Sequence, residues 1–314
     1  MSQPVLVLTR PLPVPPLTAN GQAVEVRQFR GDQAVFAQAQ VLLSTVMDPV
    51  DARLIDALPA SIRLIANVGV GLDNIDLRAA AARGIAVSNT PVVTEDTADL
   101  AFLLILASAR RLYSSESMVR SGRWNSTDMT VNLGTTVQGK TLGVVGFGAI
   151  GQAVARRARA CNMAIAYHGP RPKPEAAAAV DAIYYPQLTA MLAAADIVTL
   201  HCPLSPATRH LIDAQTLAAM KPGAILVNTG RGALVDERAL IDALHSGHLS
   251  GAGLDVFERE PTVPPQLLAM DNVTLTPHMG SATRECRGAM FDCALQNAIA
   301  CFEGRPLLTP VDPG

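Results

Sequence analysis

The sequence predicts an α/β protein built on parallel sheets, and three observations point to it. The chain of 314 residues is 49% hydrophobic but only 4% aromatic, with Ala, Val and Leu dominant, a mix suited to helices packed on a parallel sheet. Short β-branched runs alternate with helical segments along nearly the whole chain. A glycine-rich turn near residue 146 joins one such run to a helical segment. The length favours two domains, each large enough for its own core.

The part of the chain before residue 94 contains four predicted strands, at residues 5–8, 41–43, 64–67 and 85–87. Residues 94–112 then predict a long helix, with Thr and acidic residues at its start and basic residues at its end. Its longest apolar run has eight residues, far below the roughly 20 that a membrane-spanning helix needs, so we expect a buried helix that connects two domains. Residues 113–138 are polar and irregular, contain the single Trp124, and predict an arm or loop.

A second β/α series follows Lys140 and predicts a doubly wound sheet of six strands. We expect these strands at residues 141–145, 164–167, 197–200, 224–227, 253–256 and 273–276. The stretch 281–302 has a helical pattern, and the proline-rich stretches 11–16 and 306–313 indicate turns or surface linkers.

Charge and cysteine usage restrict the class of partner. The 25 basic and 27 acidic residues nearly balance, which argues against a protein that binds the phosphate backbone of nucleic acids. The N-terminus lacks a basic segment followed by a long apolar one, so no secretory signal is visible. Five cysteines without paired spacing fit reduced thiols in the cytoplasm. We expect a cytoplasmic protein with a small-molecule partner and neither nucleic acid nor membrane; no metal site is assigned.

The strongest local signal is a G-x-G-x-x-G turn between an apolar strand and a helical stretch. Its residues are Gly146, Phe147, Gly148, Ala149, Ile150 and Gly151. The first glycine permits the tight turn, the second lets the backbone approach a pyrophosphate, and the third brings helix against strand. The turn therefore predicts dinucleotide binding by these six residues.

The end of the next strand bears on the choice of dinucleotide. An acidic residue about 20 positions after the first glycine would bind the adenosine ribose, but neutral Gly169 stands where it is expected. His168 and Arg171 could instead bind a 2′-phosphate, so NADP(H) is preferred and NAD(H) is possible. The alternative is an exposed, solubilising cluster of charges in an enzyme that still prefers NAD.

Three further residues have the chemistry that a hydride-transfer site requires. Arg231 follows a strand and could clamp a substrate carboxylate with its planar cation. His278 also follows a strand and could donate a proton to an oxygen that develops negative charge. Glu260 supplies a carboxylate that could orient the His278 ring and hold its proton. Taken singly, none of them is convincing, because an Arg after a strand is more often a surface cation and a lone His is more often a structural side chain.

Together, these segments resemble the D-isomer-specific 2-hydroxyacid dehydrogenases. The signatures of that family are, in order, the glycine fingerprint, a strand that ends N-T-x-R-G, D-V-[FY]-x-x-E-P and T-P-H-x-[GA], and the likeness runs from about Asn67 to Ala282. The resemblance implies that Arg231, Glu260 and His278 are catalytic. It also implies further cofactor contacts, at Thr97, Cys202, Pro203, Thr208, Thr229, Gly230, Arg231, Asp255, His278 and Gly280.

The family places a glycine-rich turn over the substrate carboxylate. Here that turn is at residues 67–73, and the backbone N–H groups of Val70 and Gly71 would bind substrate together with Arg231 and His278. The alternative is an ordinary tight turn between a strand and a helix. For Thr97, capping of the following helix is likewise an alternative to a contact with the cofactor phosphates.

We expect a dinucleotide-binding, Rossmann-type domain at residues 95–284, inserted into a smaller flavodoxin-like domain. Residues 1–94 and 285–314 would form that substrate-binding domain, with the active site in the cleft between the two. A homodimer is expected through the helix at 94–112 and the following arm, because eight successive apolar residues exceed what one sheet face can cover.

The resemblance implies reduction of a small 2-oxo acid to the D-2-hydroxy acid with hydride from NADPH. Glyoxylate, hydroxypyruvate and a keto acid of the 2-ketogluconate type are candidates, and the glyoxylate/hydroxypyruvate reductase branch is favoured although residues 124–138 do not closely match its aromatic-rich arm. The end at Gly314 leaves no room for the regulatory domains of many phosphoglycerate dehydrogenases, and Glu260 in place of Gln disfavours formate. The alternative is a dinucleotide-sensing binding protein of the corepressor type, which would need partner-binding extensions.

Overall fold

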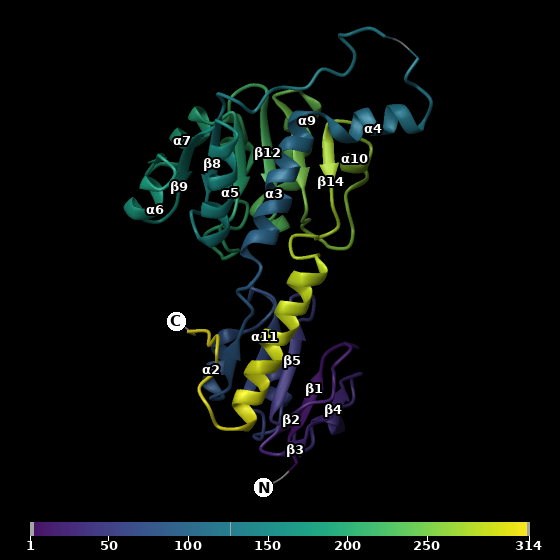
Figure 1. Cartoon of the computed structure of the whole chain (residues 1–314), viewed down its shortest axis with the longest axis vertical. Coiled ribbons are helices and arrows are strands. Elements are labelled where there is room, and N and C mark those ends of the chain that lie inside the picture. Colours follow the sequence, from purple (N-terminus) through teal and green to yellow (C-terminus); the bar gives the residue numbers. More distant parts are fainter. Residues whose placement is uncertain (1–2, 126, 313–314) are drawn as a thin grey trace. The chain divides into compact units, whose positions relative to one another are not determined.

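The computed structural model describes residues 3–125 and 127–312. The chain divides into two compact units (Figure 1). Unit 1 comprises Met1–Val93 and Ala282–Gly314, and unit 2 comprises Thr94–Ser281. Each unit has its own parallel sheet covered by helices, so the predicted α/β fold with two domains is confirmed.

Unit 1 contains a five-stranded parallel sheet of order β4-β1-β5-β6-β7. Its strands are β1 (Val5–Leu8), β4 (Glu25–Gln28), β5 (Val41–Thr45), β6 (Leu64–Val68) and β7 (Ala86–Ser88). Its other elements are the hairpin of β2 (Thr18–Ala19) and β3 (Gln22–Ala23), the short 3-10 helix η1 (Gln33–Phe36), and the helices α1 (Ala52–Ala57), α2 (Leu77–Ala82) and α11 (Arg284–Phe302). In order along the chain the strands are arranged 2-1-3-4-5, which is the flavodoxin-like order.

Successive strand residues of unit 1 are buried on opposite faces of its sheet. Val5 and Val7 belong to the cluster that includes Ile55 of α1, whereas Leu6 and Leu8 belong to the cluster that includes Leu295 of α11. This period of two is expected for strands covered on both faces. Helix α11 lies along β5 and β6, so the last helix completes the core of the unit formed by the first 93 residues (Figure 1).

Unit 2 contains a seven-stranded parallel sheet of order β10-β9-β8-β11-β12-β13-β14. Its strands are β8 (Thr141–Val145), β9 (Ala164–His168), β10 (Ala182–Tyr184), β11 (Ile197–Leu200), β12 (Ala224–Asn228), β13 (Leu249–Leu254) and β14 (Val273–Leu275). Its helices are α3 (Thr94–Ala109), α4 (Leu112–Arg120), α5 (Ala149–Ala160), α6 (Pro174–Ala178), α7 (Leu188–Ala194), α8 (Ala214–Ala218), η2 (Gly232–Leu234), α9 (Glu237–His245) and α10 (Pro265–Leu268). The strand order is the doubly wound 3-2-1-4-5-6 order with one more strand at the end.

Two hydrophobic cores lie on the two faces of the sheet in unit 2. One contains buried residues of α3 and α5 together with Ile225 and Val227 of β12, and the other contains residues of α7, α8 and α9 together with Leu226. Both faces of β12 are therefore covered. Because the strands are parallel, their carboxyl ends meet at one edge of the sheet, where ligands bind in folds of this class.

The structure corrects several predicted boundaries. The helix expected at 94–112 ends at Ala109, and Arg111 has the left-handed φ of 51°, so the chain turns before α4 begins at Leu112. Residues 112–120 are thus helical rather than irregular, and an i,i+4 ion pair between Glu116 and Arg120 supports this polar helix. The strand expected at 253–256 is β13 at Leu249–Leu254.

The sequence prediction also missed the two short edge strands, β4 and β10. The residues of β4 are partly exposed, and Ile183 in the middle of β10 is 63% exposed, so neither strand carries the apolar run of a buried one. No helix in the described part of the chain has both the length and the apolar character that crossing a membrane demands.

Candidate active site at the carboxyl edge of the sheet in unit 2

The residues predicted to be catalytic follow strands that end at the same edge of the sheet. Arg231 comes three residues after the end of β12, and His278 comes three residues after the end of β14. Glu260 lies in the loop that follows β13. Parallel pairing of β12 with β13 and of β13 with β14 brings these three loops side by side.

His278 and Glu260 form an ion pair. The Nδ1 atom of the His278 ring lies 2.7 Å from Oε2 of Glu260, which accepts its hydrogen bond. The other carboxylate oxygen accepts a hydrogen bond from the backbone N–H of Phe257 at 3.0 Å. The carboxylate is therefore fixed by the start of its own loop, and it orients the ring so that Nε2 is left for a substrate.

The Glu260 carboxyl is held in its charged form. Burial alone would raise its pKa, but the hydrogen bond from His278, the backbone hydrogen bond from Phe257 and the positive charges of His278 and Arg231 together lower the pKa below its usual value. The influence of Arg231 means that its guanidinium charge lies close enough to be felt at Glu260. All three predicted catalytic residues therefore form one electrostatic cluster.

Asp255 holds the loop that carries His278. This residue is fully buried and accepts hydrogen bonds from the hydroxyl of Thr276 (2.6 Å) and from the backbone N–H groups of Met279 (2.6 Å) and Gly280 (2.9 Å). His278 itself has a φ of 55°, an uncommon conformation for a residue with a side chain. Burial raises the pKa of Asp255 in spite of these donors. The loop conformation thus depends on a carboxylate beneath it.

Arg231 is positioned by its neighbours in the turn after β12. The side chain of Asn228 donates to the Arg231 carbonyl (2.8 Å) and accepts from the N–H of Gly230 (3.0 Å). The next residue is Gly232, where a β-carbon would lie 1.9 Å from the backbone carbon of Phe257. The absence of a side chain there allows the Arg231 turn to pack directly on the loop that contains Glu260.

This cluster can transfer a proton and bind an anion. The His278–Glu260 pair is an acid or base whose orientation is fixed, and the Arg231 guanidinium is a planar cation suited to a carboxylate. These are the two roles that the sequence predicts for the three residues, and they stay a prediction.

The glycine turn has the features that close approach of a ligand requires. Gly146 has a φ of 91°, and a β-carbon there would lie 2.5 Å from the backbone nitrogen of Cys202. At Gly151 a β-carbon would lie 2.3 Å from the Gly146 carbonyl oxygen, so the third glycine brings α5 against the turn. Gly148 caps α5, and nothing lies within 4 Å of the position of its β-carbon. The middle glycine therefore faces open space at the start of the helix, as a pyrophosphate would need.

The three other residues of this turn are placed differently. Ala149 and Ile150 begin α5, at the N-terminal end whose N–H groups are free to bind an anion. Phe147 is only 3% exposed, and its ring stacks on Tyr167 at a centroid distance of 4.2 Å. The Phe147 side chain is thus part of the core, and only its backbone can contact a ligand.

A buried hydroxyl near this turn supports the fit of a cofactor. Oγ1 of Thr229 is buried and has no hydrogen-bond partner among the described residues. Such an atom is costly unless a ligand or water satisfies it. Nearby, desolvation lowers the pKa of His201 to about 3 and raises the pKa of Cys202 to about 11, so both groups after β11 are neutral at pH 7. Thr229, Gly148 and these neutral groups are compatible with a dinucleotide at this edge.

The segment after β9 leaves the Arg171 cation accessible. His168 donates from Nδ1 to the carbonyl of Tyr185 (2.9 Å), and the Gly169 carbonyl accepts a hydrogen bond from the hydroxyl of Tyr184 (3.1 Å). Arg171 is exposed and has no ion pair or hydrogen bond with another described residue. A β-carbon at Gly169 would meet nothing within 4 Å.

The remaining predicted cofactor residues fall into two places. Thr97 is buried near the start of α3 beside Gly280, where a β-carbon would lie 3.4 Å from its methyl group. Thr208 closes the loop after β11, because its hydroxyl donates to the carbonyl of Pro203 (2.7 Å) and accepts from the N–H of Ser205 (2.8 Å). Thr208 therefore has a structural role whether or not it contacts a cofactor.

Val70 and Gly71 belong to unit 1, in the loop that follows β6. They come two and three residues after the end of that strand, at the carboxyl edge of the sheet in unit 1. Gly69, directly before them, has a φ of 153°, and a β-carbon there would lie 2.1 Å from Cγ1 of Val46. The turn is therefore a tight one that only glycine fits.

Sequence reasoning missed the residues that hold these groups in place. Asn228 ends an otherwise apolar strand, and a buried amide in that position was a signal that could have been used. In the loop that also carries Glu260, Glu258 accepts a hydrogen bond from Nε2 of His210 (2.9 Å), and its N–H donates to the carboxylate of Glu237 (2.8 Å). No pattern in the sequence connects these three residues, which are distant along the chain.

Comparison with known proteins agrees with this geometry. Residues 102–280 match the family model described as D-isomer specific 2-hydroxyacid dehydrogenase, NAD binding domain. The chain is 46% identical over 272 residues to a glyoxylate reductase of Thermococcus litoralis, covering 85% of this chain and 82% of that protein. It is also 46% identical over 262 residues to glyoxylate/hydroxypyruvate reductase A of Arabidopsis thaliana, covering 83% of this chain and 82% of that protein.

A solved structure extends the likeness to nearly the full length. The NADPH-dependent glyoxylate/hydroxypyruvate reductase of Sinorhizobium meliloti, in complex with NADP and malonate, has a TM-score of 0.87 and 36% sequence identity, and the match covers 99% of this chain and 98% of that chain. Each of these relatives is named as a reductase. The chain therefore belongs to the D-isomer-specific 2-hydroxyacid dehydrogenase family of NAD(P)-dependent enzymes.

Proposed function

We propose that this enzyme reduces glyoxylate, hydroxypyruvate or a similarly small 2-oxo acid to the D-2-hydroxy acid, with NADPH preferred as the reductant. The observation that carries the proposal is the His278–Glu260 pair, with 2.7 Å between Nδ1 and Oε2, in one electrostatic cluster with Arg231. The names of the relatives support the substrate class, because they are glyoxylate and hydroxypyruvate reductases. A keto acid of the 2-ketogluconate type is a larger candidate of the same chemistry.

In this proposal His278 is the proton donor. Its Nε2 gives a proton to the 2-oxo oxygen as negative charge develops there, and the fixed carboxylate of Glu260 stabilises the protonated ring before the transfer. Arg231 binds the substrate carboxylate and polarises the carbonyl next to it. Asp255 maintains the conformation of the His278 loop through its three hydrogen bonds.

The dinucleotide would be held at the carboxyl edge of the sheet in unit 2 and would supply the hydride that reduces C2 of the substrate. The residues around Gly146, Gly148 and Gly151 would bind its pyrophosphate, and the hydroxyl of Thr229, which has no partner among the described residues, could donate or accept a hydrogen bond to it. Exposed Arg171 and half-buried His168 at the end of β9 favour a 2′-phosphate, and no carboxylate stands at Gly169 to repel it. Unit 2 is thus the dinucleotide-binding domain of the proposal.

Unit 1 is proposed as the substrate-binding domain. The backbone N–H groups of Val70 and Gly71 are its contacts for the substrate carboxylate, in addition to Arg231. The relative with bound NADP also binds malonate, a dicarboxylate, and a carboxylate is the group that two adjacent backbone N–H groups would bind. The corepressor alternative is not favoured, because the relatives are named as enzymes.

We also propose a homodimer formed through α3, α4 and the arm that follows them. Several large apolar side chains of this region are exposed in the single chain, including Leu103 (52%), Trp124 (66%) and Leu133 (65%). Burial of such a patch against a second copy would be favourable. Light scattering at micromolar concentration should give twice the chain mass, and a stable monomer would contradict the proposal.

The five free cysteines agree with the proposed cytoplasmic location.

The activity is tested by a matrix of substrates and cofactors. Initial rates would be followed at the nicotinamide absorbance with glyoxylate, hydroxypyruvate, pyruvate and 2-ketogluconate, each with NADPH and with NADH. We expect the highest kcat/KM for glyoxylate or hydroxypyruvate with NADPH. Reduction of none of the four acids with either cofactor, by protein that still binds dinucleotide, would contradict the proposed function.

A further inference from the structure

The loop after β6 has an unusual distribution of hydrogen bonds. The carbonyls of Gly69, Val70 and Gly71 each accept one, from the backbone N–H of Thr90 (3.0 Å), from Nδ2 of Asn89 (3.0 Å) and from Nδ2 of Asn67 (2.9 Å). By contrast, the N–H groups of Val70 and Gly71 donate to no other residue in the described ranges. Three successive acceptors are therefore occupied, while the two donors between them are left over.

The occupied carbonyls determine where the N–H groups point. A carbonyl and the N–H of the next residue belong to one planar peptide and point in opposite directions. The Asn89 side chain, which holds the Val70 carbonyl, therefore turns the N–H of Gly71 to the opposite side. Thr90 does the same for the N–H of Val70, and its hydroxyl also accepts from the N–H of Gly69 (2.8 Å).

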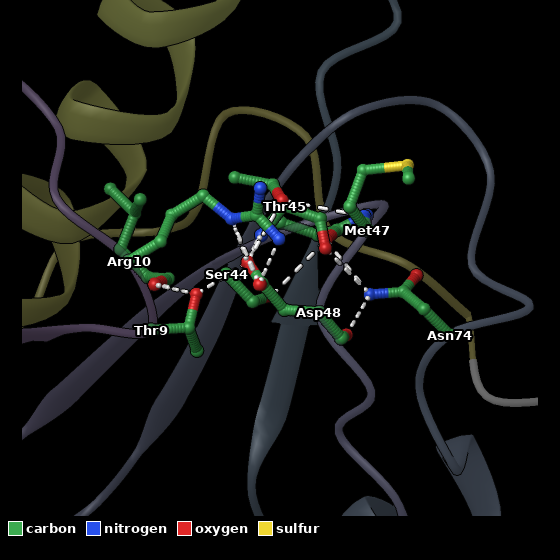
Figure 2. A network of polar contacts seen from close by, with 9 residues as sticks. Thr9, Arg10, Ser44, Thr45, Met47, Asp48 and Asn74 are labelled. Carbon is green, nitrogen blue, oxygen red and sulfur yellow. Dashed lines mark hydrogen bonds and ion pairs between the residues drawn. The ribbon is translucent and has the colours of Figure 1, made fainter. Parts of the chain in front are cut away.

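The Asn67 amide is fixed in turn by its surroundings. It is fully buried, and its oxygen accepts hydrogen bonds from the hydroxyl of Ser44 (3.1 Å) and from Nδ2 of Asn74 (3.4 Å). Only its nitrogen then remains to face the Gly71 carbonyl. Asn74 is anchored by the carbonyls of Thr45 (3.0 Å) and Asp48 (2.9 Å), as Figure 2 shows.

Behind Asn74, the network ends in an ion pair. The Asp48 carboxylate accepts from the hydroxyl of Thr9 (2.6 Å), from the backbone and side chain of Thr45 (2.9 and 2.8 Å) and from the guanidinium of Arg10 (Figure 2). These contacts join the carboxyl ends of β1 and β5 to the loop after β6. The orientation of Asn67 is therefore determined by a network of neutral groups that rests on one partly buried carboxylate.

We infer that Asn89 is a positioning residue that keeps the Gly71 N–H group available for the substrate carboxylate, beside the Val70 N–H group that Thr90 orients, and that Asn67 holds the peptide that follows. The inference rests on the proposed function, which assigns that carboxylate to these two N–H groups. Neither asparagine needs to touch the substrate. Without them, the peptides of residues 70–72 are free to rotate, and part of the binding free energy is then spent on ordering the loop.

The test uses Asn89→Ala, because Asn89 is only partly buried and its loss leaves no charge behind. We expect KM for glyoxylate and the inhibition constant of oxalate, which has carboxylates but no carbonyl to reduce, to rise together by roughly five- to tenfold. The rate constant kcat and KM for the dinucleotide should stay within about twofold, because the 70–72 peptides contact neither the transferred proton nor the cofactor in this account. Asn89→Ser, too short to reach the Val70 carbonyl, should behave in the same way and replaces the first variant if that fails to fold.

The matched control is Asn20→Ala. Asn20 also donates from its side-chain amide to a backbone carbonyl of unit 1, that of Phe302 (3.1 Å), at the C-terminal end of α11. A general loss of stability in unit 1 would raise KM for glyoxylate in both variants alike. Loss of the oriented N–H groups at Val70 and Gly71 would raise it only in the Asn89 variants. Unchanged KM and oxalate inhibition in Asn89→Ala and Asn89→Ser would overturn the inference. A wild-type enzyme that reduces no 2-oxo acid would instead overturn the proposed function.

Discussion

The loops of unit 2 that carry Glu260 and His278 and the loop after β6 in unit 1 are stabilised by different kinds of groups. In unit 2, two carboxylates hold the loops in place. Glu260 holds the His278 ring, and Asp255 accepts the three hydrogen bonds that fix the conformation of the His278 loop. In unit 1, the carbonyls of residues 69–71 are held by two asparagine amides and one backbone N–H. Charged groups therefore hold the loops of unit 2 where we propose that a proton is transferred. Neutral groups hold the loop of unit 1 that we propose only binds the substrate.

This difference has a consequence for pH dependence. Amides and hydroxyls do not titrate in the physiological range, so binding of the substrate carboxylate to unit 1 should not change with pH. Glu260 has a lowered pKa and is charged above about pH 4.5, the unperturbed value. Any change of rate between pH 6 and 9 should therefore come from the groups in unit 2 and not from the loop in unit 1.

The largest effect is expected for His278→Ala. Loss of the proton donor should lower kcat by at least about 100-fold, because proton donation matters chiefly in the transition state. Binding of NADPH, followed by its fluorescence, and inhibition by oxalate should change little by comparison. A variant that retains most of its turnover would remove His278 from the mechanism and would break the contrast between the two loops.

A smaller effect is expected for Arg171→Ala. Loss of a charge-assisted contact worth about 1.5–3 kcal/mol should raise KM for NADPH by roughly tenfold or more and leave KM for NADH almost unchanged. The kcat value should be preserved, because the 2′-phosphate is far from the reacting carbon.

Gly169→Asp should reverse the preference for NADPH over NADH, since its carboxylate repels the phosphate and binds the ribose. A wild-type enzyme that uses NADH as well as NADPH would show that the β9 loop does not set the choice.

The smallest effect concerns the Arg10–Asp48 ion pair, which supports the hydrogen-bond network behind the loop after β6. Burial would raise the pKa of Asp48, but hydrogen bonds from Arg10, Thr9 and Thr45 lower it below its usual value. A lowered pKa in the folded state means that the carboxylate stabilises the fold above pH 3.8 and that this stability is lost as the pH falls further. Asp48→Asn should therefore lower the free energy of unfolding by about 1 kcal/mol at pH 7, a value kept low because Arg10 is partly exposed.

Urea unfolding at pH 7, 4.5 and 3.5 would measure this effect. The difference between Asp48→Asn and wild type should be constant from pH 7 to 4.5 and should shrink at pH 3.5. A difference that grows as the pH falls would mean that the carboxylate does not carry the stabilisation.

The sequence was sufficient for the parts of the molecule that depend on local pattern. Aliphatic runs alternating with helices predicted both sheets. The set of Arg231, Glu260 and His278 followed from the ordered motifs that carry the family resemblance. The edge strands β4 and β10 were missed because exposed strands lack such runs. Helix α4 was missed because its residues are polar and its pattern is short.

The supporting residues were not predictable for a different reason. Asn228, Asn67 and Asn89 act through hydrogen bonds to backbone carbonyls, and which carbonyl an amide meets is decided by the tertiary fold. The Glu258–His210 contact joins residues 48 positions apart. The one usable signal, an asparagine at the end of an apolar run as at Asn67 and Asn228, was not used; a buried amide there needs a partner.

The measurement that tests the central claim most directly is the pH profile of kcat for glyoxylate reduction by wild type and Glu260→Gln. The substitution keeps the size of the side chain but removes the charge that stabilises the protonated His278 ring. We expect kcat of the variant to fall short of wild type at every pH and by the largest factor at high pH, with KM for glyoxylate little changed. A loss of the same factor from pH 6 to 9 would mean that Glu260 only orients the ring, and that its charge has no part in proton donation.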